Sequence, residues 1–277
     1  MNKLIGLSFV LVCLSACQKS QNLETIPYTY LSGRTFTDKK VNYEVIDGEA
    51  IVEGDISLGT QEQAEAIRNF KEKSRNAVSV SARSSLWEKG IVYYEVDPAL
   101  PNPDRVFEAQ AMIQEVSRIR FVKRTSQRDY VYYQAVAGTV CSSGVGRRGG
   151  RQVIKLSERC SVGSTAHESL HALGLWHEQS RSDRDDFIVI HWDNIESEKK
   201  FNFDFIGENE RLLNDYDYSS IMHYGSMAFS KNEKPTITKK DGSSTKGMGQ
   251  RKGLSDGDVK AINSLYSRDE GELAIRN

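Results

Sequence analysis

Residues His167 to His177 read HESLHALGLWH. Three of the chain's five histidines, His167, His171 and His177, lie within it. Residues four apart on a helix share one face, so His167 and His171 can bind the same metal ion. Glu168 projects beside them, where its carboxylate can hold a water molecule rather than the metal.

The third histidine requires a turn of the chain. If the helix continued past His171, His177 would lie about 9 Å further along its axis, out of reach of the same ion. Gly174 lies between the two and can adopt the left-handed conformation that ends a helix. A lone buried histidine is usually structural, and Thr165 with Glu168 would by themselves fit a capping box. The third histidine in register favours a metal site over both alternatives.

Three neutral imidazoles with an open fourth position are typical of a catalytic zinc site, whereas structural zinc sites are closed and rich in cysteine. We therefore expect one catalytic Zn²⁺ as the cofactor. Zinc lowers the pKa of its water to about 7 and polarises a carbonyl oxygen. Glu168 would take the proton of that water and pass it to the leaving amine, which predicts peptide-bond hydrolysis without a covalent intermediate.

The pattern HExxHxxGxxH is that of the metzincins, and its flanks resemble the astacin family of zinc endopeptidases. Glu178 follows the third histidine, as in that family, and residues 220–227 (SIMHYGSM) resemble its Met-turn. The resemblance implies that Met222 lies beneath the metal. It also implies that Tyr224 is an additional, switchable zinc ligand that stabilises the oxyanion of the transition state. Core packing is the alternative role for both residues.

The resemblance extends from about Trp87 to Tyr266 and implies an α+β fold of two subdomains. We expect a small, twisted, mostly antiparallel sheet with the active-site helix, then a less regular subdomain, with zinc in the cleft between them. The pattern predicts three helices, over Pro103–Ile119, from Ser164 or Thr165 onward, and over Val259–Tyr266. It predicts five strands, over Val41–Ile46, Ile91–Val96, Ile119–Lys123, Tyr130–Gln134 and Gln152–Leu156.

The N-terminal residues indicate export. Leu4–Leu14 is an apolar run of signal-peptide length, too short to span a membrane. Leu14-Ser15-Ala16-Cys17 resembles the lipobox of bacterial lipoproteins, which predicts a lipid on Cys17, with plain secretion as the alternative. Composition leaves thiols, metal ligands and disulfides open for the other cysteines. Export favours a disulfide between Cys141 and Cys160, and the family has one there.

The segment before Trp87 resembles an astacin pro-segment. Val52-Glu53-Gly54-Asp55 resembles the family's FxGD motif, with Val52 in place of Phe, which implies that Asp55 binds the zinc in the latent form. A simple Gly-Asp turn is the alternative. Activation would then need a protease that cuts near residues 75–84, and the new N-terminus, near Asn76 or Ala77, would be buried close to Glu178.

Four regions follow: residues 1–16 as signal peptide, 17–76 as pro-segment, 77–267 as astacin-like peptidase domain, and 268–277 as polar tail. With 37 Lys and Arg against 38 Asp and Glu, the net charge of −1 gives no electrostatic grip on nucleic acid. We expect a monomeric zymogen that hydrolyses proteins or peptides. It would be lipid-anchored to a bacterial membrane as a precursor and released on activation. The alternatives are another metzincin family and an anchored binding protein that keeps zinc as scaffold.

Overall fold

The computed structural model describes residues 24–27, 30–31, 34–35, 40–64, 86–204 and 212–267, with side chains from residue 42 on. The predicted signal peptide, Cys17, the activation stretch at residues 75–84 and the polar tail all lie outside the described residues. Within the described part, no helix is long and apolar enough to cross a membrane.

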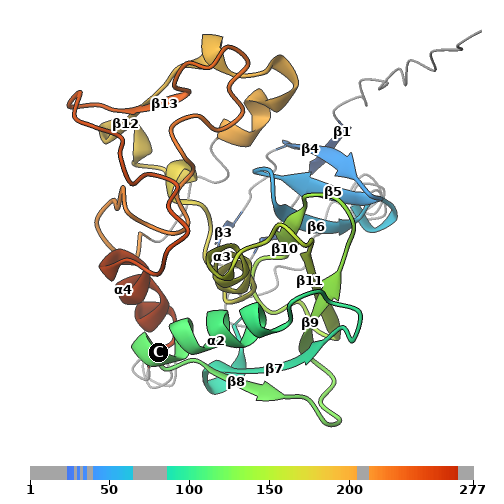
Figure 1. Cartoon of the computed structure of the whole chain (residues 1–277). Coiled ribbons are helices and arrows are strands. Elements are labelled where there is room, and N and C mark those ends of the chain that lie inside the picture. The colour runs from blue at the N-terminus through green and yellow to red at the C-terminus, as the bar shows by residue number, and fades with distance from the viewer. Residues whose placement is uncertain are drawn as a thin grey trace, which may run out of the picture.

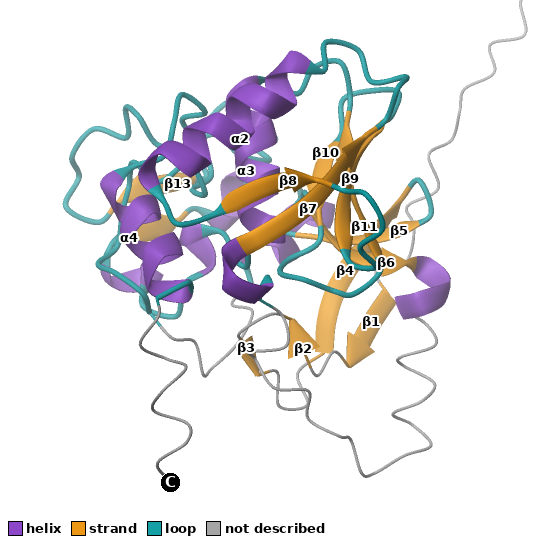
Figure 2. Ribbon diagram, turned by 90° about the horizontal axis from the view of Figure 1, so that it is seen from below, coloured by secondary structure: helices purple, strands orange, loops and turns teal. Residues whose placement is uncertain are grey.

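A nine-stranded sheet forms the framework, in the order β1-β4-β5-β6-β10-β11-β9-β7-β8 (Figures 1 and 2). Its strands are β1 (Glu24–Pro27), β4 (Lys40–Ile46), β5 (Glu49–Val52), β6 (Ile56–Thr60), β7 (Ile91–Val96), β8 (Arg120–Lys123), β9 (Tyr130–Ala135), β10 (Cys141–Ser143) and β11 (Arg151–Leu156). A separate hairpin joins β2 (Tyr30–Leu31) to β3 (Arg34–Thr35). Each of the five predicted strands is present, with bounds within one residue.

The expectation of a mostly antiparallel sheet is wrong. β8, β7, β9 and β11 pair in parallel, and the first antiparallel pair in the catalytic part is β10 with β11. Helix α2 (Asp104–Val116) lies between β7 and β8 in the chain and provides the long crossover that parallel neighbours need. The strand pattern predicted where strands lie but carried no signal for their direction.

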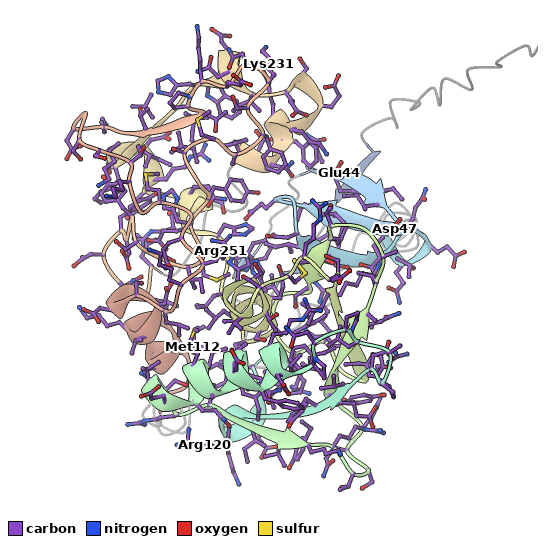
Figure 3. All side chains as sticks on the ribbon, viewed as in Figure 1. Glu44, Asp47, Met112, Arg120, Lys231 and Arg251 are labelled. Atoms are coloured by element: carbon purple, nitrogen blue, oxygen red, sulfur yellow. A yellow bond between two sulfur atoms is a disulfide. The ribbon has the colours of Figure 1, made fainter. Side chains whose placement is uncertain are left out.

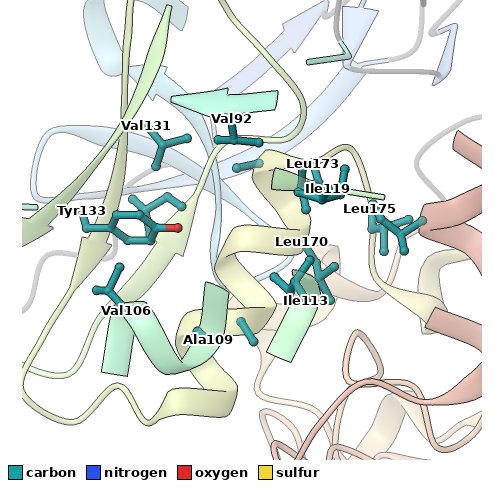
Figure 4. Packing of buried hydrophobic residues seen from close by; sticks show 14 of the residues in the cluster. Val92, Val106, Ala109, Ile113, Ile119, Val131, Tyr133, Leu170, Leu173 and Leu175 are labelled. Carbon is teal, nitrogen blue, oxygen red and sulfur yellow. The ribbon is translucent and has the colours of Figure 1, made fainter. Parts of the chain in front are cut away.

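The main core lies between this sheet and the helices α2 and α3 (Val162–Ala172) (Figure 4). α2 contributes Val106, Ala109 and Ile113, which lie at helical spacing and are fully buried. They pack with Leu170 and Leu173 at the far end of α3 and with Val92, Val131 and Tyr133 from the strands. α2 ends at Val116, three residues earlier than predicted, where the extended backbone of Ser117 closes it.

The C-terminal subdomain is less regular, as expected, and forms the lobe at the upper left of Figure 1. It carries the antiparallel pair β12 (Ile188–Ile190) and β13 (Ile237–Lys239). It also has short 3₁₀ turns at Glu178–Ser180, Arg184–Asp186, Trp192–Asn194 and Ser197–Phe203, and another 3₁₀ turn, Glu88–Gly90, precedes β7. The last helix, α4 (Asp256–Leu265), begins with a capping box of Ser255 and Asp258.

The strands of the predicted pro-segment extend the sheet formed by residues 91–156. β4, β5 and β6 form an antiparallel meander, and β6 pairs in parallel with the catalytic strand β10 through Ile56 and Ser143. A second core forms at this junction. It contains six residues of the predicted pro-segment, Tyr43, Ala50, Val52, Ile56, Leu58 and Ala64. The other two, Val145 and Trp176, come from the predicted peptidase domain. Val52 is only 1% exposed, so the smaller side chain still packs where the family motif has Phe.

Cys141 and Cys160 form the expected disulfide, with their Cα atoms 6.0 Å apart. The bond ties the start of β10 to the residues just before α3. A loop of this size contributes about 3 kcal/mol to stability in the chain-entropy account. Strand β10 and helix α3 are therefore fixed to each other.

Asp258 is expected to anchor the Met-turn to α4. Its buried carboxylate accepts hydrogen bonds from the Ser220 hydroxyl (2.6 Å) and the Ile221 N–H (2.9 Å), besides its capping contacts with Ser255. Asp258→Ala would leave buried donors unpaired and lower the free energy of unfolding by about 3 kcal/mol in urea titrations. Asp256→Ala, an exposed aspartate in the same helical turn, should cost less than about 1 kcal/mol. Equal losses for the two variants would contradict this role.

Candidate metal centre

The active-site helix α3 begins earlier than predicted. Ser161 is its N-cap and accepts a hydrogen bond from the Ser164 N–H at 3.0 Å, so neither Ser164 nor Thr165 starts the helix. Gly163 in the first turn permits a close contact, because a Cβ there would lie 1.7 Å from the carbonyl oxygen of Arg251. In Figure 3, Arg251 lies beside this helix. Nine of its eleven residues, from Gly163 to Ala172, are buried.

The helix ends where the histidine pattern requires. Gly174 has a φ of 112°, and its N–H donates to the His171 carbonyl at 2.8 Å. The Leu175 N–H donates to the Leu170 carbonyl at 3.0 Å, which closes a C-terminal cap. The chain reverses there and returns His177 to the face that carries His167 and His171.

The three imidazoles converge through their Nε2 atoms. His167 Nε2 lies 3.1 Å from that of His171 and 3.2 Å from that of His177. Their Nδ1 atoms bond elsewhere at 2.8 Å, to the Ile221 carbonyl, the Leu175 carbonyl and the Glu53 carboxylate respectively. Because each Nδ1–H donates outward, each Nε2 directs its lone pair inward, as a metal ligand must.

Asp55, from the predicted pro-segment, completes the cluster. Its carboxylate lies 3.2 Å from Nε2 of both His167 and His177 and 3.6 Å from that of His171. Ligands at zinc bond lengths of about 2.0–2.1 Å in a tetrahedron are about 3.3 Å apart, so these four side chains fit one zinc ion. Burial alone would raise the pKa of Asp55, but the charge of His177 and hydrogen bonds from the three histidines hold it well below the usual value.

Glu53 also belongs to the site, although the sequence did not predict a role for it. Its carboxylate is fully buried and accepts hydrogen bonds from His177 Nδ1 and the Ser180 hydroxyl, both at 2.8 Å. Despite burial, Asp55 and Glu53 raise the pKa of His177 to about 9, so the site favours a positive charge at this point. Bound zinc would supply that charge. The only available signal was its place beside Gly54 and Asp55, since its partner lies more than a hundred residues away.

Glu168 lies beside the cluster, on α3, and is 2% exposed. Its Oε2 atom is buried without a hydrogen-bond partner among the described residues. Burial and then the nearby charge of Asp55 raise its pKa well above the usual value. A buried carboxyl with a free oxygen next to a metal site has the features of a general base.

The Met-turn contributes Tyr224 and Met222 to this region of the structure. The ring centroid of Tyr224 is 4.8 Å from that of His177, and its hydroxyl donates a short hydrogen bond to the carbonyl of Glu53. Tyr224 thus contacts the same segment that carries Asp55. Met222 is 1% exposed and belongs to the main core, and its carbonyl accepts the N–H of Glu178 at 3.1 Å.

Glu178 follows the third histidine and is 9% exposed. One of its oxygens accepts bonds from Arg181 at 3.0 Å and from the N–H of Asp217 at 2.8 Å, while burial raises its pKa to about 7. Next to it, a hollow of about 670 Å³ is lined by Arg181 and Asp217 together with parts of α4. This hollow is large enough for several residues of chain.

Residues 79–267 match the Astacin family of peptidases, and the chain belongs to this family. It is 44% identical over 186 residues to the zinc metalloproteinase nas-6 of Caenorhabditis elegans, covering 65% of this chain and 54% of that protein. It is 36% identical over 230 residues to the astacin-like metalloprotease toxin 1 of Loxosceles intermedia, covering 80% and 83%. The chain spans about half the length of the nematode relatives that it matches.

The fold agrees with the sequence match. The structure is similar to high choriolytic enzyme 1, a hatching enzyme zinc-protease of the medaka fish Oryzias latipes. The TM-score is 0.61 at 35% identity, over 69% of this chain and 98% of that one. The α+β architecture with a histidine cluster is therefore the astacin-like metzincin fold, and the cluster of three histidines and one aspartate is its catalytic zinc site.

The purified chain should hold one zinc ion by elemental mass spectrometry. His171→Ala removes a ligand, and we expect its zinc affinity to fall at least about 100-fold, because even residues behind the ligands change it by 10- to 100-fold. His191→Ala is the matched control, since His191 bonds to the hydroxyl of Thr238 at 2.8 Å, outside the cluster. Unchanged zinc affinity in His171→Ala would contradict the assigned site.

Proposed function

We propose that this protein is a zinc-dependent endopeptidase made as a latent precursor. One observation carries the proposal: a buried carboxylate, Glu168, has a free oxygen beside three imidazoles whose Nε2 atoms face a common point. The family match supports the same activity, with protein or peptide chains as the substrates.

Each residue of the site has a separate role in the proposed hydrolysis. Zinc held by His167, His171 and His177 would polarise the scissile carbonyl and acidify a water molecule. Glu168 takes the proton of that water during attack and delivers it to the departing amine. Tyr224, once free of Glu53, aims its hydroxyl at the oxyanion. Met222, buried in the main core, would lie beneath the metal.

Glu168→Gln tests the catalytic role. The variant keeps the size of the side chain but has no base, so kcat of the trypsin-activated protein should fall about 10²- to 10⁴-fold. Zinc content and the unfolding transition should match those of the parent. The measurement is cleavage of a quenched fluorescent peptide library.

The same variant separates the peptidase from an anchored binding protein. A binder that keeps zinc only as scaffold has no need of a base, so Glu168→Gln would leave its biological activity intact. Unchanged biological activity together with no hydrolysis by the parent chain would support the binder and refute the peptidase.

We propose that Asp55 maintains latency. Its carboxylate would take a ligand position on the zinc that substrate and water need, while Glu53 bonds to His177 and accepts the Tyr224 hydroxyl. Gly54 fits a tight space, since a Cβ there would lie 2.8 Å from the ring of Phe229, and its N–H donates to Asn202 at 3.2 Å. The pro-segment would thus block the metal site and contact His177 and Tyr224 beside it.

Asp55→Ala should activate the uncut chain. Loss of one metal ligand opens the fourth position, and we expect at least a tenfold rise in peptide cleavage before any processing, equivalent to about 1.4 kcal/mol. Gel electrophoresis would verify that the chain stays uncut. Glu62→Ala, an exposed acid of the same segment, is the control and should remain latent. An uncut Asp55→Ala protein as silent as the parent would count against this switch.

Export and activation complete the proposal. The N-terminal residues support a signal peptide of residues 1–16 and a lipid on Cys17, so the precursor would be anchored to a bacterial membrane. A cut near residues 75–84, at Arg75 or Arg83, would then release the catalytic domain. The new N-terminus would enter the hollow beside Glu178. Mass spectrometry that found lipidated Cys17 still joined to the active domain would refute this release.

A further inference from the structure

The turn between β5 and β6, residues 53–55, brings two carboxylates to one imidazole. Asp55 lies 3.2 Å from Nε2 of His177, the nitrogen that faces the metal position. Glu53 accepts a hydrogen bond from Nδ1 of the same ring at 2.8 Å. Asp55 is the metal ligand of the proposed latent form, whereas Glu53 bonds to the nitrogen that faces away from the metal. Its contact with His177 therefore has a different purpose.

His177 differs from the other two histidines in what its Nδ1 atom contacts. The Nδ1 atoms of His167 and His171 bond to neutral main-chain carbonyls within the part of the chain that matches the Astacin family. His177 donates instead to a carboxylate, and this carboxylate comes from the predicted pro-segment. A carboxylate behind a ligating imidazole makes the ring a more basic ligand, and loss of such a partner typically lowers metal affinity about 10- to 100-fold.

The charge of Glu53 has no offsetting lysine or arginine. The side chain is fully buried, and no cation of the described residues other than the His177 ring forms an ion pair with it. Its Oε2 atom also accepts the Ser180 hydroxyl at 2.8 Å, while Oε1 is buried without a hydrogen-bond partner in the described part of the chain. A buried carboxylate is unfavourable unless a positive charge offsets it. Zinc bound to Nε2 would place that charge across the ring from Glu53.

The backbone of Glu53 supports a specific role for this residue. Its φ is 46°, in the left-handed region that is unfavourable for a residue other than glycine. Such a conformation persists only where the surrounding contacts require it. Here the contacts are those of the carboxylate with His177 and of the Glu53 carbonyl with the Tyr224 hydroxyl.

We propose that Glu53 is a positioning residue for the zinc ligand His177, and that the precursor is the form in which the protein acquires its zinc. Asp55 adds a fourth ligand and Glu53 strengthens His177, so the precursor would bind zinc more tightly than the activated protein. A cut near residues 75–84 would remove both carboxylates together and leave Nδ1 of His177 without this acceptor. The inference rests on the proposed zinc peptidase precursor, and it goes beyond latency, for which Asp55 is sufficient.

The test measures the zinc Kd of the uncut chain by competition with a chromophoric chelator. All proteins carry Glu168→Gln, so that none can cut itself. Glu53→Gln removes the charge but keeps the size of the side chain, and we expect it to raise the zinc Kd about 10- to 100-fold. Glu49→Gln is the matched control, because Glu49 also joins this segment to the catalytic part, through its ion pair with Lys155 at 3.2 Å. Its zinc Kd should stay within about twofold of the parent value.

A second comparison does not depend on how well Glu53→Gln folds. Asp55→Ala lacks the fourth ligand but keeps Glu53, whereas the trypsin-activated protein lacks both. The uncut Asp55→Ala chain should therefore bind zinc at least about tenfold more tightly than the activated protein. Circular dichroism of the zinc-free proteins shows whether each variant keeps the fold, and this comparison decides the question if Glu53→Gln does not.

Equal zinc Kd values for the parent and a folded Glu53→Gln chain would overturn the proposal. So would an equal rise in Glu49→Gln, which would mean that docking of the segment, rather than the contact with His177, controls zinc affinity. An uncut Asp55→Ala chain that binds zinc no more tightly than the activated protein would also refute it.

Hydrolysis is measured separately, with Glu168 intact. If that chain cleaves no peptide after activation, the proposed peptidase function fails, yet the zinc Kd values still decide the role of Glu53. If it cleaves peptides while Glu53→Gln leaves the zinc Kd unchanged, the function stands and the role of Glu53 is refuted.

Discussion

Three imidazole nitrogens that face one another at 3.1 and 3.2 Å are the constraint on which the rest of the structure depends. Lone pairs held this close repel one another unless a cation or protons lie between them. The protein holds them there by hydrogen bonds from Nδ1, two of which end on backbone carbonyls. One acceptor, Ile221, belongs to the Met-turn that Asp258 anchors to α4. The C-terminal helix therefore supports the metal centre through one short chain of contacts.

The proposed latency would use the same groups as the proposed catalysis. Asp55 approaches the ligands, Glu53 bonds His177 and accepts the Tyr224 hydroxyl, and Ile56 pairs with the strand edge. In the proposed precursor, each contact occupies a group that would act on the substrate after activation. Removal of this segment would expose the histidine cluster, the Tyr224 hydroxyl and the edge of β10 together.

Local patterns predicted the elements with strong periodicity and the residues with fixed spacing. The convergence of the three histidines could be predicted from residues 167–177 alone, because helix rise and a glycine turn determine where each side chain lies. Three features had no local signal: the parallel direction of β7 and β8, the three-residue strand β10, and the burial of Glu53. All three depend on contacts between segments far apart in the chain. The free energy of such contacts outweighs the local conformational preference of the sequence. Asp55 was predicted from the resemblance to the family motif. The contact of Glu53, two residues earlier, with His177 is visible only in the structure.

The second core shows how the pro-segment can be both firmly docked and removable. Its eight buried members include only two from the catalytic part, Val145 and Trp176. Six apolar side chains of a short meander form too small a core to be stable alone, so its order depends on docking against these two. While the linker is intact, docking is intramolecular and the effective concentration is high. A cut in the linker removes that advantage without changing any contact. Release then depends on the docked interface alone, where Val52 buries less apolar surface than the phenylalanine of the family motif would.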